Sequence, residues 1–424
     1  MIKRLIYSFY LMLLSPVFAL VIGLKEQNFR FKRALLVVFI TLYGSTIVLS
    51  DGQDGLVHLG NVYEHYVTLP FAQFFNELIS IIRFSPEYGT NDDIYIHLLS
   101  YFVGSILGMP QLFFVFVSFI YAYFFAGSIF KVLRILPKTK LSFTFYAFAV
   151  IFLLQKNLEG INTVRTWTGL WVLFYAVLSY LETKKLKYLI LMFMPPLIHV
   201  GYFIMAIPAW FVVFFGRRFM VVYAGIFFVS FFYGINKNTA MESLAQTEVG
   251  ANKSEGYYVE EGNDNQSEKY DKATWYRKSQ KSGLQNYALY LIAFSLIFGG
   301  VYFKKMTSLE NNLFSIGILT KALSNFSFFI YALASRSNLI GSIFILAAFV
   351  IILKRGLFQM DKNWKNIVFN GIFAISIALF FPYIIYKIAD LIYFISFFML
   401  ALPFIPWIFN DINFSIRKLL DWIF

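Results

Sequence analysis

Long apolar runs follow one another along the chain, and most of them are too hydrophobic for the surface of a water-soluble protein. The runs that suit membrane-spanning helices cover residues 6–23, 34–50, 111–130, 141–155, 165–181, 187–200, 202–216, 219–234, 286–303, 312–334, 337–353, 366–384 and 389–409. Of the 424 residues, 59% are hydrophobic and 14% are charged, whereas soluble proteins average about 45–50% apolar and 25% charged residues. We therefore expect an all-α, polytopic integral membrane protein with about 13 spans, within a range of about 11 to 14, in a single domain. A soluble enzyme is excluded.

Basic residues gather in alternate connections between these runs, which fixes an orientation. Because cytoplasmic loops carry an excess of Lys and Arg, all of these connections are expected in the cytoplasm, together with the C-terminus. This orientation places Lys3 and Arg4 on the outer side, contrary to the excess of basic residues expected in the cytoplasm. The same clusters account for the net charge of +13 without a nucleic-acid partner. The basic groups lie at Lys25–Arg33, Lys131–Lys140, Lys184–Lys187, Arg217–Arg218, Lys304–Lys305, Lys354–Lys365 and Arg417–Lys418.

Two outer connections are long enough to hold structure of their own. In the first, residues 51–110, apolar side chains at helical spacing over 71–82 predict a helix that either lies in the membrane interface or packs against the bundle. The apolar stretch 94–109 is expected to be re-entrant or interfacial. The second connection, residues 235–285, mixes eight acidic with seven basic side chains and cannot cross lipid. We expect it to be disordered or to cover a site.

The first outer connection also carries a row of polar residues. In the segment DGQDGLVHLGNVYEHY, a helix starting at Asp54 would place four polar side chains on one face: Asp54, His58, Asn61 and His65. Asp54, His58 or Asp51 is then expected to act as a general base toward a hydroxyl group. Glu64 and His65 are expected to contact the substrate. The alternative is an ordinary solvated face.

Few residues are available for a metal site. The chain has no cysteine and four histidines, which excludes disulfides and thiolate ligands. His58 and His65 are seven positions apart, or about 10 Å along a helix, which is too far to share one ion. We therefore expect no metal and no other cofactor.

A second group of candidate site residues lies where apolar runs begin on the outer side. Arg165 in KNLEGINTVRTWTGLW opens one run, with Trp167 beside it as a further expected contact of the substrate, and Arg336 lies at another outer junction. A guanidinium matches the geometry of phosphate oxygens, so we expect Arg165 and Arg336 to bind an anionic substrate. The alternative is that an arginine at a membrane boundary is only an interface anchor. His199, at the apex of the hairpin 187–216, is expected either to orient a substrate or to be a hydrogen-bonded structural residue.

The order of these features resembles the EpsG family of membrane polysaccharide polymerases, which are relatives of the Wzy O-antigen polymerases. The likeness covers roughly residues 1–215. It runs through the acidic first outer loop (SDGQDG to YEHY), the segment NDDIYIHLLSYFVGSILG before an aromatic run, the outer Arg that opens a helix (INTVRTWTGLWVLFYAVLSYLETKKLKYL), and the His after a short apolar run (LILMFMPPLIHVGYFIMAIP).

The resemblance implies a GT-C-like membrane glycosyltransferase. It would polymerise undecaprenyl-diphosphate-linked oligosaccharide repeats of O-antigen, capsule or exopolysaccharide at the outer face of the bacterial inner membrane. Arg165 and Arg336 would hold the diphosphate, His199 would orient a sugar or phosphate, and Asp54 or His58 would take the acceptor proton. Its partners would be the lipid-linked glycans, membrane lipids, a chain-length regulator and a flippase.

Two other functions fit the same composition. A flippase for lipid-linked oligosaccharides would also be basic and polytopic, but it usually has two similar halves and charged residues along a central cavity. A membrane acyltransferase of polysaccharide synthesis would need a buried His near the end of a span, and His199 or His97 could serve.

Overall fold

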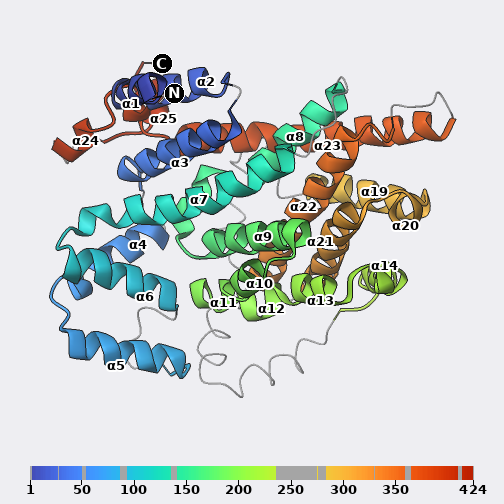
Figure 1. The fold of residues 1–424 in the computed structure, drawn as a ribbon, viewed down its shortest axis with the longest axis horizontal. Coiled ribbons are helices and arrows are strands. Elements are labelled where there is room, and N and C mark those ends of the chain that lie inside the picture. The colour runs from blue at the N-terminus through green and yellow to red at the C-terminus, as the bar shows by residue number, and fades with distance from the viewer. Residues whose placement is uncertain are drawn as a thin grey trace.

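The computed structural model describes residues 2–26, 28–49, 54–85, 93–134, 141–234, 275, 283–328, 330–358, 364–408 and 413–423. Helices and turns make up these residues, which include no β-strand (Figure 1). Ser396 and Ser415 form an isolated bridge. The predicted all-α class is therefore confirmed for the described part of the chain. Asp51 and almost all of the polar connection 235–285 lie outside it.

The helices of the first half differ in part from the predicted apolar runs, since the run 6–23 is divided at Ser15, which caps a new helix that begins with Pro16. They are α1 (Ile2–Leu14), α2 (Pro16–Gly23), α3 (Phe29–Ser45), α4 (Asp54–Asn61), α5 (Phe71–Ile82), α6 (Ile94–Tyr101), α7 (Phe113–Arg134), α8 (Phe143–Leu154) and α9 (Thr166–Thr183). Short π-helical and 3₁₀-helical segments flank these helices. These are the π-helical η1 (Val62–Tyr66) and η2 (Phe102–Ile106) and the 3₁₀-helical η3 (Pro110–Leu112) and η4 (Leu158–Thr163).

The second half begins with short helices and ends with long ones. Prolines in the first turns of α11 and α13 help to divide the predicted hairpin 187–216 into four helices, because proline lacks the N–H that a continuous helix needs. The elements are α10 (Leu186–Met192), α11 (Pro195–Ile198), α12 (Tyr202–Met205), α13 (Ile207–Phe215), η5 (Gly216–Phe219), α14 (Met220–Val229), α19 (Leu284–Phe298), α20 (Val301–Lys304), α21 (Ser308–Phe326), α22 (Tyr331–Lys354), α23 (Trp364–Phe394), η6 (Phe397–Met399), α24 (Ile405–Ile408) and α25 (Ile416–Ile423).

Four helical stretches of the described chain are long and apolar enough to cross a membrane. They are Pro110–Arg134, Tyr202–Val229, Tyr331–Lys354 and Asn366–Phe394. The second stretch consists of α12, α13, η5 and α14 in succession, and Gly216 has a φ of 58° at the junction of α13 and η5. The four stretches are compatible with a polytopic membrane protein. The expected 13 spans and the orientation of the chain stay predictions.

Helix α23 runs through the break that the sequence suggests between the apolar runs 366–384 and 389–409. Lys387 and Asp390 interrupt the apolar pattern there. The helix continues because Lys387 finds a partner from a distant part of the chain, with its Nζ 2.6 Å from Glu159 Oε1. A buried charge that is neutralised in this way can lie within a helix that is otherwise apolar.

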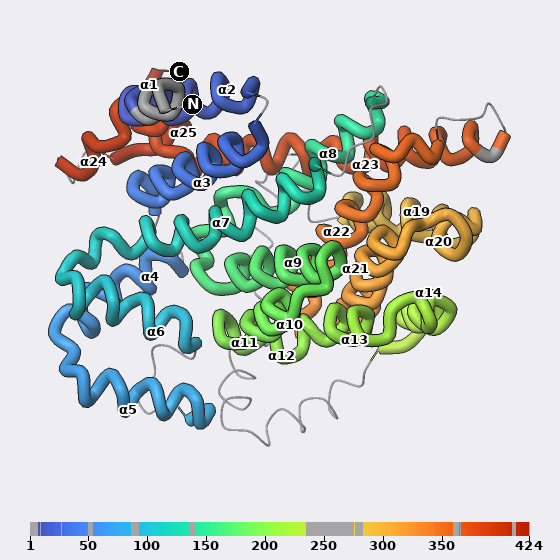
Figure 2. The backbone as a smooth tube through the Cα atoms, in the orientation of Figure 1, coloured from blue at the N-terminus to red at the C-terminus, as the bar shows by residue number. Residues whose placement is uncertain are grey.

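Helix α9 is the most enclosed helix of the first half and starts directly after Arg165. Its side chains are buried continuously from Thr166 to Ser179. Helix α7 packs against it on one side and α10 and α11 pack on the other (Figure 2). Because α9 has 18 residues, its ends are separated by about 27 Å. Arg165 at its start and Lys184 at its end therefore lie on different faces of the bundle.

Helices α21 and α22 cross with their backbones in close contact. A Cβ atom built on Gly317 would lie 2.8 Å from Ile345 N and 3.0 Å from Gly341 O, and one built on Gly341 would lie 2.9 Å from Gly317 O. Backbone atoms cannot move aside as a flexible side chain can. Small residues at such a crossing permit the tight packing that holds helices together in an apolar environment.

We expect Gly317→Ala to lower the melting temperature of the detergent-solubilised protein, because the added methyl group must push α21 and α22 apart. The cost is on the order of 1–3 kcal/mol. Gly371→Ala in α23 is the matched control, since no atom lies within 4 Å of its added Cβ. A melting temperature that changes equally in both variants would contradict this account of the crossing.

Candidate functional site

Four segments that are far apart in the sequence meet at one group of polar side chains. Asp93 directly precedes α6, Arg165 directly precedes α9, His199 directly follows α11, and Arg336 lies near the start of α22. Arg165 Nη1 is 2.5 Å from Asp93 Oδ2, His199 Nδ1 is 3.2 Å from the same oxygen, and Arg336 Nη1 is 3.0 Å from His199 Nε2. The backbone N–H of Val200 donates to Asp93 Oδ1 at 2.7 Å. We call Asp93, Arg165, His199 and Arg336 the outer cluster, after the side of the membrane on which the sequence predicts them.

The contacts of His199 fix its protonation. A guanidinium only donates hydrogen bonds, so His199 Nε2 accepts from Arg336 and carries no proton. The proton of the neutral ring is then on Nδ1, which donates to Asp93. Burial and the charges of Arg165 and Arg336 lower the pKa of His199, against the opposing effect of Asp93. His199 is therefore a neutral bridge that fixes one arginine relative to the carboxylate, and both of its ring nitrogens are engaged.

Asp93 is the acid at the centre of the outer cluster. Burial by itself would raise its pKa, but the hydrogen bond from His199, the charge of Arg165 and the N–H of Val200 together lower the pKa well below its usual range. The carboxylate is therefore charged at neutral pH. With two arginines, one carboxylate and a neutral histidine, the cluster carries one net positive charge.

A strained turn presents Arg165. Its N–H donates to Thr163 O at 2.5 Å, and the residue between them, Val164, has φ 53° and ψ −59°. This is a γ-turn with a β-branched residue in the left-handed half of the φ range, which is rare and costs energy. Such a conformation persists only where surrounding contacts hold it.

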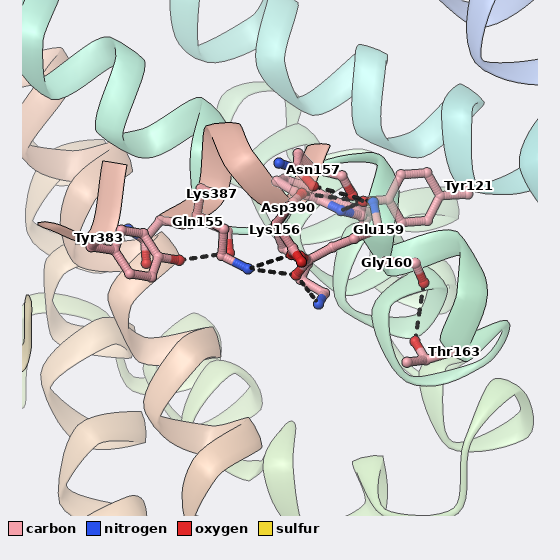
Figure 3. A network of polar contacts seen from close by, with 11 residues as sticks. Tyr121, Gln155, Lys156, Asn157, Glu159, Gly160, Thr163, Tyr383, Lys387 and Asp390 are labelled. Carbon is pink, nitrogen blue, oxygen red and sulfur yellow. Dashed lines mark hydrogen bonds and ion pairs between the residues drawn. The ribbon is translucent and has the colours of Figure 1, made fainter. Parts of the chain in front are cut away.

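Buried ion pairs hold the segment that leads into this turn (Figure 3). Glu159 Oε1 lies 2.5 Å from Lys156 Nζ and 2.6 Å from Lys387 Nζ, which belongs to α23. Burial would raise the pKa of Glu159, but the two lysine charges lower it to about 2. Asp390 Oδ2 lies 3.9 Å from Lys387 Nζ. We call Lys156, Glu159, Lys387 and Asp390 the bracing cluster, because it joins η4 to α23.

Aromatic hydroxyl groups add to this brace. Tyr121 of α7 donates to the carbonyl oxygens of Lys156 and Asn157 at 3.2 and 2.7 Å, and Tyr383 of α23 donates to Gln155 O at 3.1 Å (Figure 3). Two long helices thus hold the short segment before Arg165. The predicted site residue Trp167 also belongs here, since its ring lies 4.6 Å from Lys156 Nζ and its side chain is buried.

Helix α4 brings the predicted proton acceptors toward the outer cluster. It packs against η4 at Gly55, where an added Cβ would lie 2.4 Å from Asn162 Oδ1. His58 is buried, whereas Asp54 is exposed at the start of the helix. Burial and then the charge of Arg165 lower the pKa of His58 to about 4, while Asp54 and Asp93 act in the opposite direction. His58 is neutral at pH 7, and its Nδ1 has no hydrogen-bond partner among the described residues.

The remaining predicted residues of the first outer connection lie in a separate group. The π-helical η1 changes the register after Asn61, and His65 Nε2 lies 3.0 Å from the Glu77 carboxylate of α5. Glu64 is exposed. His97 accepts from Tyr66 at 2.8 Å, donates to Phe74 O at 3.1 Å, and stacks on the Phe74 ring. These contacts fasten α5 to the bundle.

Helix α5 packs against the bundle on one side, which is one of the two predicted arrangements, and its position in a membrane interface stays a prediction. Phe74 and Ile81 are buried against the rest of the protein, while Phe71, Phe75 and Ile82 are 69%, 50% and 55% exposed. A helix with one packed side and one exposed apolar side suits a position at the edge of a membrane.

The structure therefore joins Arg165 and Arg336, which the sequence predicts to bind an anion. It places His199 between them, which the sequence predicts either to orient a substrate or to be a hydrogen-bonded structural residue, and it adds Asp93. The sequence signal for Asp93 was its place at the N-cap of an apolar helix. An aspartate there usually caps the helix, but this carboxylate makes no capping hydrogen bond and turns toward Arg165 and Val200 instead. Among the described residues, no three His, Asp or Glu side chains are grouped closely enough to hold a metal ion.

Comparisons of the chain with protein-family models, with curated proteins and with solved structures gave no match.

The pKa of His58 predicts a loss of stability in acid. A histidine has a pKa of about 6.5 when unfolded, so between pH 6.5 and 4 the unfolded chain binds a proton that the folded chain does not bind. The free energy of unfolding therefore decreases as the pH is lowered, by on the order of 2 kcal/mol at pH 5. The melting temperature should drop less between pH 7.5 and pH 5 in His58→Asn than in the wild type. Equal drops would show that His58 does not titrate in this way.

The bracing cluster predicts an order of effects on stability. Glu159→Gln leaves two buried lysines without their shared carboxylate and should cost about 3–5 kcal/mol. Lys387→Met keeps the pair between Glu159 and Lys156 and should cost less. The control is Glu182→Gln, which removes a more exposed pair with Lys131 and should cost less than about 1 kcal/mol. Thermal melts of the purified variants test the order, and a Glu159→Gln protein as stable as the control would contradict it.

Proposed function

We propose that this chain is a membrane glycosyltransferase that polymerises lipid-diphosphate-linked oligosaccharide repeats, in the manner of the EpsG and Wzy families. The observation that carries the proposal is the outer cluster. In it, two guanidinium groups from α9 and α22 are fixed through a single buried carboxylate and a neutral histidine.

The charge of the outer cluster suits a diphosphate. One net positive charge remains after Asp93 is counted, and each arginine has five N–H donors of which only some are used within the cluster. The Arg165 side chain is 26% exposed, so a ligand can reach it. Two planar guanidinium groups fixed in position bind the oxygens of a diphosphate and oppose the charge that develops when it leaves.

In the proposed reaction, the bond between the anomeric carbon of the donor glycan and the diphosphate oxygen breaks. The hydroxyl oxygen of the acceptor repeat forms the new glycosidic bond, its proton passes to a base, and the lipid diphosphate leaves as the anion. Arg165 and Arg336 bind the donor diphosphate. Asp93 and His199 are positioning residues, since they act through the arginines.

Helix α4 supplies the proton acceptor in this proposal. Asp54 is exposed at the start of the helix, and His58 is neutral with an unpartnered ring nitrogen. A general base needs a free lone pair for the proton that it takes, and the unpartnered ring nitrogen of His58 can supply one. Glu64, His65 and Trp167 stay predicted contacts for the glycan, and a chain-length regulator and a flippase stay predicted partners.

The length of surface glycan tests the function. Cells that lack the protein are complemented with the wild type, Asp54→Asn, Arg165→Ala or His199→Ala at matched expression, and the glycan is separated on a gel. We expect the deletion to leave single repeats on the surface and the variants to fail to restore the ladder. Loss of all repeats from the surface would favour a flippase, and an unchanged ladder would overturn the proposal.

The replacement Arg165→Lys separates phosphate binding from anchoring. A lysine keeps the charge but cannot present the planar fork or keep the same contact with Asp93. We expect glycan polymerisation to fall at least about tenfold, nearly as far as in Arg165→Ala. Arg83→Ala, at an exposed arginine after α5, is the control and should polymerise as the wild type does. Wild-type polymerisation in Arg165→Lys would make Arg165 an anchor.

A further inference from the structure

A polar cavity lies away from the outer cluster, among the ends of α9, α13 and α21. It has a volume of about 430 Å³ and is lined by Lys184, Arg217, Arg218, Ser308, Asn312 and the chain from Val213 to Phe219. We call it the basic cavity. Two turns with positive φ shape it: Lys184 at the end of α9 has φ 55°, and Gly216 between α13 and η5 has φ 58°.

Among the described residues, the lining of the basic cavity carries three cations and no acid. The carboxylates nearest in sequence to these segments have other partners. Glu182 pairs with Lys131, and Glu310 caps α21 through the N–H of Thr307 and lies 2.9 Å from Arg355 Nη2. The cations that line the cavity are therefore not neutralised by these two acids, and an anion would be attracted there.

Helix α21 adds polar groups suited to an anion. Its first residue, Ser308, lines the cavity, and the start of a helix carries a partial positive charge. Asn312 also lines the cavity, is only 6% exposed, and has an Oδ1 atom without a hydrogen-bond partner among the described residues. The NH₂ group of an asparagine carries two hydrogen-bond donors, which suit an anion.

Aromatic side chains surround the charged groups. Phe214, Phe215 and Phe219 line the same cavity and are 59%, 45% and 39% exposed. Apolar surface next to a cluster of cations is the combination that fits a phosphate group with a lipid chain attached. The cavity also lies at the far end of α9 from Arg165, at a separation of about 27 Å, close to the thickness of the apolar part of a bilayer.

We propose that the basic cavity binds a phosphate-bearing anion at the face of the bundle opposite to the outer cluster. Arg217, Arg218 and Lys184 bind the phosphate oxygens, and Ser308 and Asn312 of α21 donate further hydrogen bonds. The phosphate belongs either to a lipid headgroup, whose chain lies along the three phenylalanines, or to a soluble phosphate ester.

Native mass spectrometry of the purified full chain in detergent tests the site. The wild type is titrated with phosphatidylglycerol, with phosphatidylcholine of the same acyl chains, and with glycerol phosphate. We expect phosphatidylglycerol to bind more tightly than phosphatidylcholine. Arg217→Gln/Arg218→Gln should weaken its binding on the order of tenfold or more. Lys304→Gln/Lys305→Gln removes the same charge from a basic pair outside the cavity lining and should bind as the wild type does.

The three ligands separate the sources of the phosphate. Binding of phosphatidylglycerol without binding of glycerol phosphate, lost in the arginine variant alone, identifies a lipid headgroup. Binding of glycerol phosphate that is lost in the same variant identifies a soluble ester. Equal binding of phosphatidylglycerol and phosphatidylcholine, or equal losses in the two double variants, would overturn the proposal. Asn312→Leu, which removes no charge, should also weaken binding if the cavity itself is occupied.

Discussion

A buried carboxylate needs counter-charges in direct contact with it, and at Asp93 this requirement joins several distant segments of the fold. In a nearly dry site, one negative charge stays ionised only with cations and N–H donors in direct contact. Asp93 obtains these from Arg165, His199 and the backbone of Val200. The start of α6, the start of α9 and the end of α11 are therefore held together, and Arg336 joins through His199.

The same requirement appears at Glu159, with a different result. Its carboxylate is shared by two lysines and has no arginine contact, so this cluster is neutralised within itself when Asp390 is included. It braces the segment before Arg165 against α23, whereas the outer cluster keeps a net positive charge. The strained γ-turn at Val164 lies between the two clusters. Contacts on both sides thus hold a conformation that the local sequence disfavours.

The basic residues of a polytopic membrane protein are usually explained by its orientation, but those at the two ends of α9 lie in two different chemical settings. At one end, arginines are combined with a buried acid. At the other end, Lys184, Arg217 and Arg218 line a cavity beside exposed phenylalanines, and no acid lies among its described lining residues. The two ends of α9 therefore differ mainly in the groups that surround the basic residues, and less in the number of positive charges.

The sequence by itself determined the helical class, the apolar character and the identity of the few polar residues that could carry chemistry, because these depend on composition and on local spacing. Arg165, His199 and Arg336 stand out as polar exceptions in apolar surroundings. Only the tertiary structure decided their partners. From the sequence, Asp93 could have been a helix cap, but it pairs with Arg165 and His199 instead. A π-helical turn divides the predicted stripe from Asp54 to His65. Lys387 suggests the end of a span in the sequence, whereas in the structure it pairs with Glu159. Pairings of this kind depend on the register and crossing of helices distant in sequence, and no local pattern records them.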